Sequence, residues 1–120
     1  MRRIPGSFKA QSNVSVSGSK IVVGVLCAEF GVDKDDGYRT GRTGWVITHL
    51  RSGFVFPAAF ASKSTVFRVV ESLSCAAVWA SRRWKFGVMP GRRSKLLKAA
   101  GDSWLQSTKE AATPQRRLRR

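Results

Sequence analysis

The excess of positive charge constrains this chain more than any other feature of its sequence. Lys and Arg number 22 against 7 Asp and Glu, which gives a formal net charge of +15. Self-repulsion of this size opposes compaction unless a polyanion shares the surface. Ordinary solubility requires a net charge of only about 2 to 8 in magnitude. The chain is therefore expected to fold around a modest core with its cations outside, facing a negatively charged partner.

The length and composition of the chain fit one small domain with extended ends. It has 120 residues, of which 42% are hydrophobic, enough for a modest core. We divide it into a flexible basic N-terminal arm (1–19), a core domain (20–86), a basic helical extension (87–110) and an Arg-rich disordered tail (111–120). No apolar run approaches the roughly 18 residues of a membrane span.

The cysteines and the N-terminal composition bear on the compartment. Cys27 and Cys75 give no disulfide framework, and we interpret both as small buried hydrophobes. This favours an intracellular, reducing compartment such as the cytoplasm or nucleoid. Residues 1–28 contain no acid and are rich in Ser, Arg and Lys, as in organellar transit segments. Pro5 and Gly6 disfavour the amphipathic helix that such a segment needs, so an organelle is the lesser alternative.

Three segments have the composition of β-strands. Residues 21–30 are almost continuously apolar and predict a central strand, in which Gly24 marks a bulge or a close backbone approach. Residues 31–44 are rich in Gly and Asp and predict a long loop. Residues 45–50 and 54–60 flank Arg51-Ser52-Gly53 and predict a β-hairpin. Pro57 cannot donate to a ladder, which places the second hairpin strand at a sheet edge.

A helix follows the hairpin. Ser62 or Ser64 can cap it, and apolar residues recur at three- and four-residue spacing as far as Ala80. Residues 92–100 predict a second, short basic helix that Gly101 stops or weakens, while Trp104 and Leu105 can anchor one more turn. The fold class is therefore α+β: a three-stranded antiparallel sheet with one long helix packed on one face (β-β-β-α), followed by a short basic C-terminal helix and flexible basic ends.

The inventory of catalytic groups is poor. His49 is the only histidine, and a triad with Ser52 and an aspartate requires a geometry that sequence does not supply. We expect His49 to occupy a half-buried strand position or to contact a phosphate. Cys27, His49 and Cys75 stand singly on separate elements, so we expect no metal site. Residues 33–37 do not match a calcium loop, and the glycines that follow do not form a P-loop. We expect no enzyme activity and no cofactor.

The segment from Arg82 to Lys98 has the composition of a nucleic-acid contact. Its cations are not interrupted by any acid, and Trp84 and Phe86 lie among them. Lys and Arg neutralise phosphates and release counterions, and aromatic rings stack on unpaired bases. The alternative for the aromatics is that they close the core after the helix.

Two further regions are candidates. The loop and hairpin carry Arg39, Arg42 and Arg51, with Tyr38, and a β-ribbon can enter the major groove of DNA. The two basic ends can add affinity with little sequence preference. The predicted nucleic-acid-binding residues are Arg39, Arg42, Arg51, Arg82, Arg83, Trp84, Lys85, Arg92, Arg93, Lys95, Lys98, Arg116, Arg117, Arg119 and Arg120.

Three functions fit this pattern. The first is a small protein that binds DNA or RNA through phosphate contacts and a few aromatic or arginine contacts. The second is a structural component of a ribonucleoprotein or viral particle. The third is an inhibitor or adaptor that binds an acidic, nucleic-acid-like protein surface. The sequence leaves open DNA against RNA, single against double strand, sequence specificity and the oligomeric state.

Overall fold

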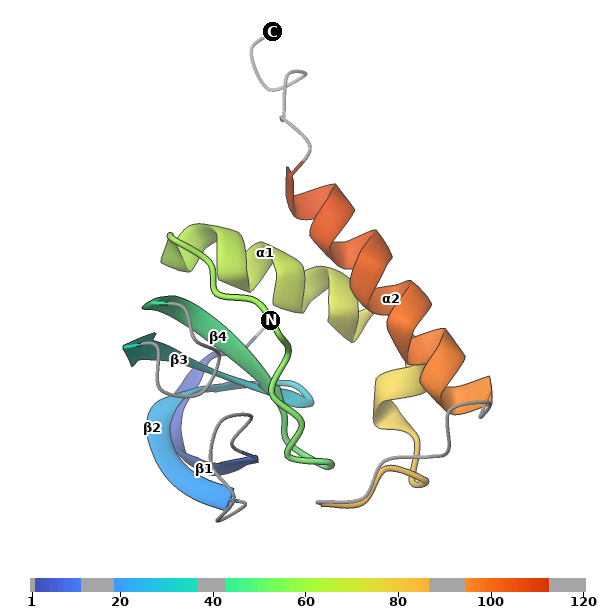
Figure 1. Ribbon diagram of the computed structural model, residues 1–120, viewed down its shortest axis with the longest axis horizontal. Helices are drawn as coiled ribbons and strands as arrows, with labels where there is room; N and C mark the ends of the chain where they lie inside the picture. Colours follow the sequence, from blue (N-terminus) through green and yellow to red (C-terminus); the bar gives the residue numbers. More distant parts are fainter. Residues whose placement is uncertain (1, 12–18, 37–42, 87–94, 113–120) are drawn as a thin grey trace, which may run out of the picture.

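The computed structural model describes residues 2–11, 19–36, 43–86 and 95–112. These residues form one antiparallel sheet with the strand order β1-β2-β3-β4, covered by helices (Figure 1). The strands are β1 (Ile4–Gln11), β2 (Ser19–Cys27), β3 (Phe30–Asp36) and β4 (Thr43–His49). The predicted α+β class is confirmed, whereas the predicted count of three strands is wrong because the sheet has four.

The first strand lies inside the segment predicted to be a flexible arm. β1 pairs with β2 along its whole length, from Ile4 opposite Leu26 to Gln11 opposite Ser19. Of its side chains, Phe8 and Ala10 are buried. Pro5 is tolerated because β1 is an edge strand. Two buried residues in a Ser-rich and basic stretch are too weak a pattern to predict a strand.

The predicted central strand over residues 21–30 is two strands joined by a tight turn. Ala28 adopts a left-handed conformation (φ 55°), and Cys27 pairs with Phe30 across the turn. β3 then runs through the first part of the predicted loop. Its Gly31 is a packing residue, since a Cβ there would come 2.6 Å from the Phe8 ring. The turn contains no glycine and β3 contains one, so the local sequence pattern places the strand boundary wrongly.

Gly24 allows β2 to bend and the sheet to curl. A Cβ on Gly24 would come 2.1 Å from the carbonyl oxygen of Val32, so the predicted close backbone approach is confirmed. β2 pairs with β3 only over Val25–Cys27, and Figure 1 shows it curving away. At the far end of β1, the Gln11 amide donates to the Gly53 carbonyl at 2.8 Å. The sheet therefore curls so that β1 contacts the turn after β4.

The predicted hairpin is present in part. β4 forms its first strand, but residues 54–60 make only isolated bridges to it, with Thr48 opposite Val55 and Trp45 opposite Phe60. The amide of Phe56 still donates to the Ile47 carbonyl at 3.0 Å. This return segment lies along the open edge of β4, as predicted from Pro57.

The first helix, α1 (Lys63–Ser74), lies across the sheet. The Ser62 hydroxyl accepts a hydrogen bond from the Thr65 amide at 3.1 Å, which confirms Ser62 as the N-cap. Val66, Val69, Val70 and Leu73 are buried as the spacing predicts, together with Phe67. The helix ends earlier than predicted, and a 3₁₀ turn, η1 (Ala77–Ala80), follows. This change of direction buries Trp79, which a continuous helix would have placed on its outer face.

The second helix, α2 (Lys95–Ala112), is longer than predicted. It runs through Gly101, and a Cβ at that position would meet no atom within 4 Å. Trp104 fastens the helix to the core by stacking on Phe56, with 4.5 Å between ring centroids. Among the described residues, no helix is long and apolar enough to cross a membrane.

Candidate nucleic-acid interface

The only histidine is a fully buried core residue. His49 has no exposed surface, and its Nε2 lies 2.9 Å from the carbonyl oxygen of Trp79. Since a carbonyl only accepts, Nε2 carries the proton and Nδ1 accepts from the Ser52 hydroxyl at 2.9 Å. The Ser52 oxygen in turn accepts from the Phe54 amide at 3.2 Å. This chain of hydrogen bonds ties the turn after β4 to η1.

His49 and Ser52 have a structural role in the core. Burial lowers the pKa of His49, against the opposing effect of the hydrogen bond to the Trp79 carbonyl, so the ring is neutral. The expected half-buried position or phosphate contact is wrong, because the ring is closed off among Phe30, Trp79 and Trp84. Ser52 is only 2% exposed, which leaves no approach for a substrate.

The cysteines and acids add no metal site within the described residues. No three His, Cys, Asp or Glu side chains of the described ranges lie close enough together to hold an ion. Cys27 is buried, which raises the pKa of its thiol. Cys75 is exposed, so the expectation that both cysteines are buried fails for it.

Trp84, which we predicted to contact nucleic acid, belongs to the core. It is 2% exposed, and its indole Nε1 donates to the Val78 carbonyl at 2.8 Å. Its ring stacks on Trp79 with centroids 5.6 Å apart and planes within 13°. The alternative interpretation, in which an aromatic residue closes the core after the helix, is therefore the correct one for Trp84. Its ring is not accessible to a base.

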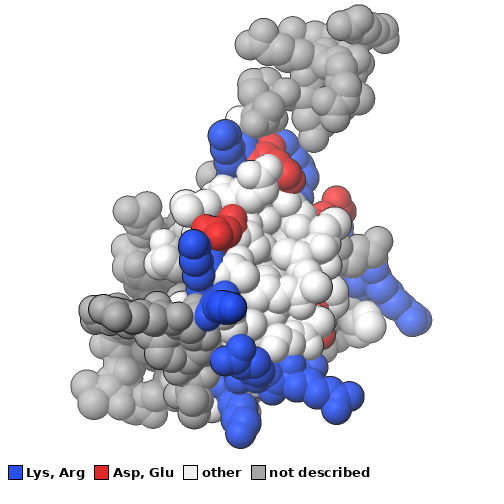
Figure 2. Space-filling view, turned by 90° about the vertical axis from the view of Figure 1, so that its right-hand side faces the viewer, with Lys and Arg blue, Asp and Glu red and all other residues white. Residues whose placement is uncertain are grey.

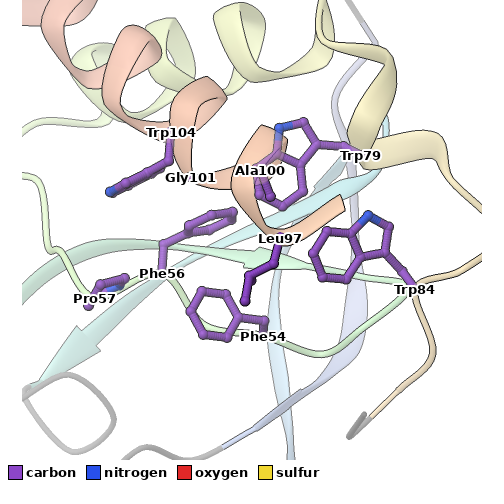
Figure 3. A pocket seen from close by; sticks show the side chains of 9 residues that line it. All are labelled: Phe54, Phe56, Pro57, Trp79, Trp84, Leu97, Ala100, Gly101 and Trp104. Atoms are coloured by element: carbon purple, nitrogen blue, oxygen red, sulfur yellow. The ribbon is translucent and has the colours of Figure 1, made fainter. Parts of the chain in front are cut away.

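An apolar cavity of about 300 Å³ adjoins Trp84 (Figure 3). Its wall includes Phe54 and Phe56 from the return segment, Trp79 and Trp84, and Leu97 and Trp104 from α2. The two indole donors on this wall are already occupied: Trp79 Nε1 bonds to the Ser103 hydroxyl and Trp84 Nε1 to the Val78 carbonyl. The cavity also shows that the segment around Trp84 and the first turns of α2 lie side by side.

Phe86 is the exposed aromatic of this region. It is 38% exposed, and within the described part of the chain it is the one aromatic among the exposed large hydrophobic residues. Its ring rests on Gly53, where a Cβ would come 2.2 Å from ring atom Cε2. The Nζ atom of Lys9 lies over the ring, 5.9 Å from its centroid. Three distant segments, β1, the turn after β4 and residues 82–86, thus meet at one end of the molecule.

Exposed basic side chains lie along the segments that contribute to this end, with Lys9 directly over the Phe86 ring. We call it the basic end and define it by the exposed residues Lys9, Arg82, Arg83, Lys85, Phe86, Lys95 and Lys98. Within the described part of the chain, no ion pair joins its arginines and lysines to an acid. Figure 2 shows Lys and Arg gathered along the lower edge of one face, while most of the acidic side chains on that face lie higher.

Arg51 differs from the other predicted contact residues because it already has a partner. Its guanidinium Nη2 lies 3.6 Å from Glu29 Oε1, and both side chains are partly exposed. Arg51 lies in the same turn as Gly53, next to the basic end, but the neighbouring carboxylate offsets part of its positive charge. The structure therefore ranks Arg51 below Arg82, Arg83 and Lys85 as a phosphate contact.

The remaining predicted residues fall outside the described ranges, namely Tyr38, Arg39, Arg42, Arg92, Arg93, Arg116, Arg117, Arg119 and Arg120. Sequence reasoning missed Lys9, because only the pairing of β1 and the curl of the sheet carry it to Phe86. No local signal in the sequence could have placed it there.

No family model, curated protein or solved structure matches this chain. The interpretation of the basic end therefore depends on its own geometry and charge.

Proposed function

We propose that this protein binds nucleic acid through its basic end and acts by binding, without catalysis. The observation that carries the proposal is one exposed aromatic ring with Lys9 over it and Lys85 next to it in the sequence, together with cations that have no acidic ion-pair partner within the described residues. Each cation that neutralises a phosphate releases a counterion, which is the main source of affinity for a polyanion.

Two lysines at the start of α2 support the same proposal. Lys95 and Lys98 stand at the start of α2, where the helix dipole is positive and the first turn holds no acid. Cations at this end of a helix are unfavourable unless an anion is nearby. A bound phosphate backbone would relieve both this cost and the mutual repulsion of Arg82, Arg83 and Lys85.

The buried polar groups support binding over catalysis. The one Ser–His pair of the described chain is closed to solvent, and the second ring nitrogen of His49 is bonded to a backbone carbonyl. The pair contributes hydrogen bonds that hold the turn under Phe86, which is a structural role.

The test is a titration of the nuclease-treated protein against labelled single- and double-stranded DNA and RNA at several salt concentrations. Six phosphates neutralised by Lys9, Arg82, Arg83, Lys85, Lys95 and Lys98 give a log–log salt slope of roughly −5 on duplex DNA. The basic-end variant Arg82→Gln/Arg83→Gln/Lys85→Gln should reduce that slope by about 2 to 3 and weaken binding on the order of 10- to 100-fold at roughly 100 mM salt.

A matched control removes the same charge elsewhere. Arg3, Lys63 and Arg68 lie on or against α1, which Figure 1 shows at the opposite end from the turn after β4. The control variant Arg3→Gln/Lys63→Gln/Arg68→Gln should bind almost as well as the parent protein. Equal losses in the two variants would show a non-specific charge effect and refute the basic end as the site. Weak binding of all four ligands at roughly 150 mM salt, near 10⁻⁴ M, would point instead to an acidic protein partner.

A further inference from the structure

The ring of Phe86 is held in a fixed position while part of it stays open to solvent. Gly53 has a left-handed backbone (φ 74°), and the absence of a Cβ lets the Phe86 ring lie against the turn. The turn is itself fastened by the Gly53 amide, which donates to the His49 carbonyl at 2.7 Å, and by the bond from Gln11 to the Gly53 carbonyl. A ring seated in this way loses little conformational freedom when a ligand covers it.

An exposed phenylalanine is costly in water unless something covers it. Burying a Phe side chain is worth about 1.5–3 kcal/mol, and the neighbouring Trp84 shows that this segment can bury an aromatic ring completely. Phe86 instead has two cations beside it: Lys85 precedes it in the chain, and Lys9 Nζ lies 5.9 Å from its centroid. The chemistry of this patch is an apolar planar face bordered by positive charge.

A nucleotide of a single strand presents the complementary chemistry. Its base offers an apolar planar face, and its phosphates offer negative charge on either side. In a duplex the base faces are occupied by their neighbours in the stack, so a protruding ring reaches them only in an unpaired strand. Aromatic side chains that alternate with basic ones are the usual means of holding single strands without sequence choice.

We propose that Phe86 is a stacking platform for an unpaired base, and that it makes the basic end selective for single-stranded nucleic acid. The proposal rests on the nucleic-acid binding inferred above and names the form of the ligand. Lys9 and Lys85 then neutralise the phosphates that flank the stacked base. Lys9 reaches this position only because β1 pairs into the sheet.

The experiment compares four ligands of one length, roughly 12 nucleotides, which suits a site of this size. They are a mixed-sequence DNA strand, the same sequence as RNA, an abasic DNA strand and the DNA duplex. The parent protein should bind the base-containing strands more tightly than the abasic strand and the duplex. The better of the DNA and RNA strands identifies which nucleic acid the platform accepts.

Two substitutions isolate the ring. Phe86→Leu keeps an apolar contact with Gly53 but removes the planar face, and it should weaken binding to the base-containing strands by about 5- to 150-fold, the usual range for one stacked base. Its affinity for the abasic strand and the duplex should stay unchanged. Phe86→Trp restores a planar face and should restore the single-strand affinity. Thermal unfolding of each variant checks that the fold is retained.

The outcomes separate the two proposals. If Phe86→Leu leaves single-strand affinity unchanged while the basic-end variant weakens it, stacking is wrong and nucleic-acid binding stands. If the parent protein binds the abasic strand as tightly as the base-containing ones, stacking is also wrong, whatever the variants do. If neither variant weakens any ligand, the basic end is not the site and both proposals fall together.

Discussion

The α1 face, which we define by Arg3, Lys63, Arg68 and Glu71, uses its cations in the opposite way from the basic end. On the α1 face, the Arg3 guanidinium lies 4.0 Å above the centroid of the Phe67 ring and 3.9 Å from a carboxylate oxygen of Glu71. Lys63 lies over the ring of Trp45 at 5.6 Å. At the basic end, Arg82, Arg83 and Lys85 have no acidic partner among the described residues. Charge counted in the sequence is therefore not the charge available to a ligand.

Two acidic residues, Glu110 and Glu71, lie on the side of the molecule that carries the α1 face. Hydrogen bonds from Gln106 and from the Ser72 hydroxyl lower the pKa of Glu110, so this carboxylate is ionised where α2 meets α1. Glu71 stands nearby on α1. These negative charges lie beside the cations of the α1 face, whereas within the described residues no ion pair joins a cation of the basic end to an acid.

The largest effect should come from removing the buried ring that supports the basic end. Trp84→Ala deletes a side chain that is 2% exposed and should destabilise the protein by about 3–5 kcal/mol. Urea denaturation measures the loss. The matched control is Leu105→Ala on α2, where the side chain is 66% exposed and the change should stay within about 0.5 kcal/mol. A small loss for Trp84→Ala would mean that the basic end has no support from the core.

Acid should loosen the basic end before the α1 face, because the neutral His49 ring ties the turn after β4 to η1. The folded pKa of His49 is lowered by burial, below an unfolded value of 6.5. The folded state therefore binds fewer protons, and the stability contributed by the neutral ring is complete above about pH 6.5 and falls as the pH decreases toward the folded pKa. The melting temperature should drop between pH 7 and pH 5, and amide exchange should accelerate first at residues 49–54. Uniform acceleration across α1 and the turn would contradict this order.

The smallest expected effect is on nucleic-acid affinity, and it is measured by neutralising one of two acids that each pair with an arginine. Glu29→Gln removes the partner of Arg51 beside the basic end, and Glu71→Gln removes the partner of Arg3 on the α1 face. Surface ion pairs are worth up to about 1 kcal/mol, so freeing Arg51 should tighten nucleic-acid binding by at most about fivefold. Freeing Arg3 should leave the affinity unchanged. Equal gains would mean that net charge, and not its position, governs binding.

The parts of the fold that follow from local patterns were predictable. The spacing of Val66, Val69, Val70 and Leu73 defines the buried side of α1, and Ser62 caps it as expected. What sequence could not supply were features that depend on distant residues. Gly31 looks like a loop residue until Phe8 is known to fill the space above it. Ala28 gives no sign that it will take a left-handed turn, so two strands looked like one.

The candidate site shows the same limit. Composition selected the Arg82–Lys98 segment as a basic contact, and its described cations Arg82, Arg83, Lys85, Lys95 and Lys98 are exposed, but composition could not distinguish Trp84 from Phe86. They lie two positions apart, and only the packing of Trp84 on Trp79 and of Phe86 on Gly53 separates the core residue from the surface one. Arg51 resembled a free contact because its pairing with Glu29 depends on how the turns are brought together.

The hydrogen bond from Gln11 to Gly53 has a consequence for when the basic end is assembled during folding. It closes the sheet by joining the beginning of the chain to its middle, and contacts of this kind form late because a long loop must first be ordered. Lys9 reaches Phe86 only once this closure is made. An incompletely folded chain has the same composition and net charge but lacks the assembled surface. Any ligand that needs Lys9 and Phe86 together will bind only the closed form and will stabilise it in proportion to its affinity.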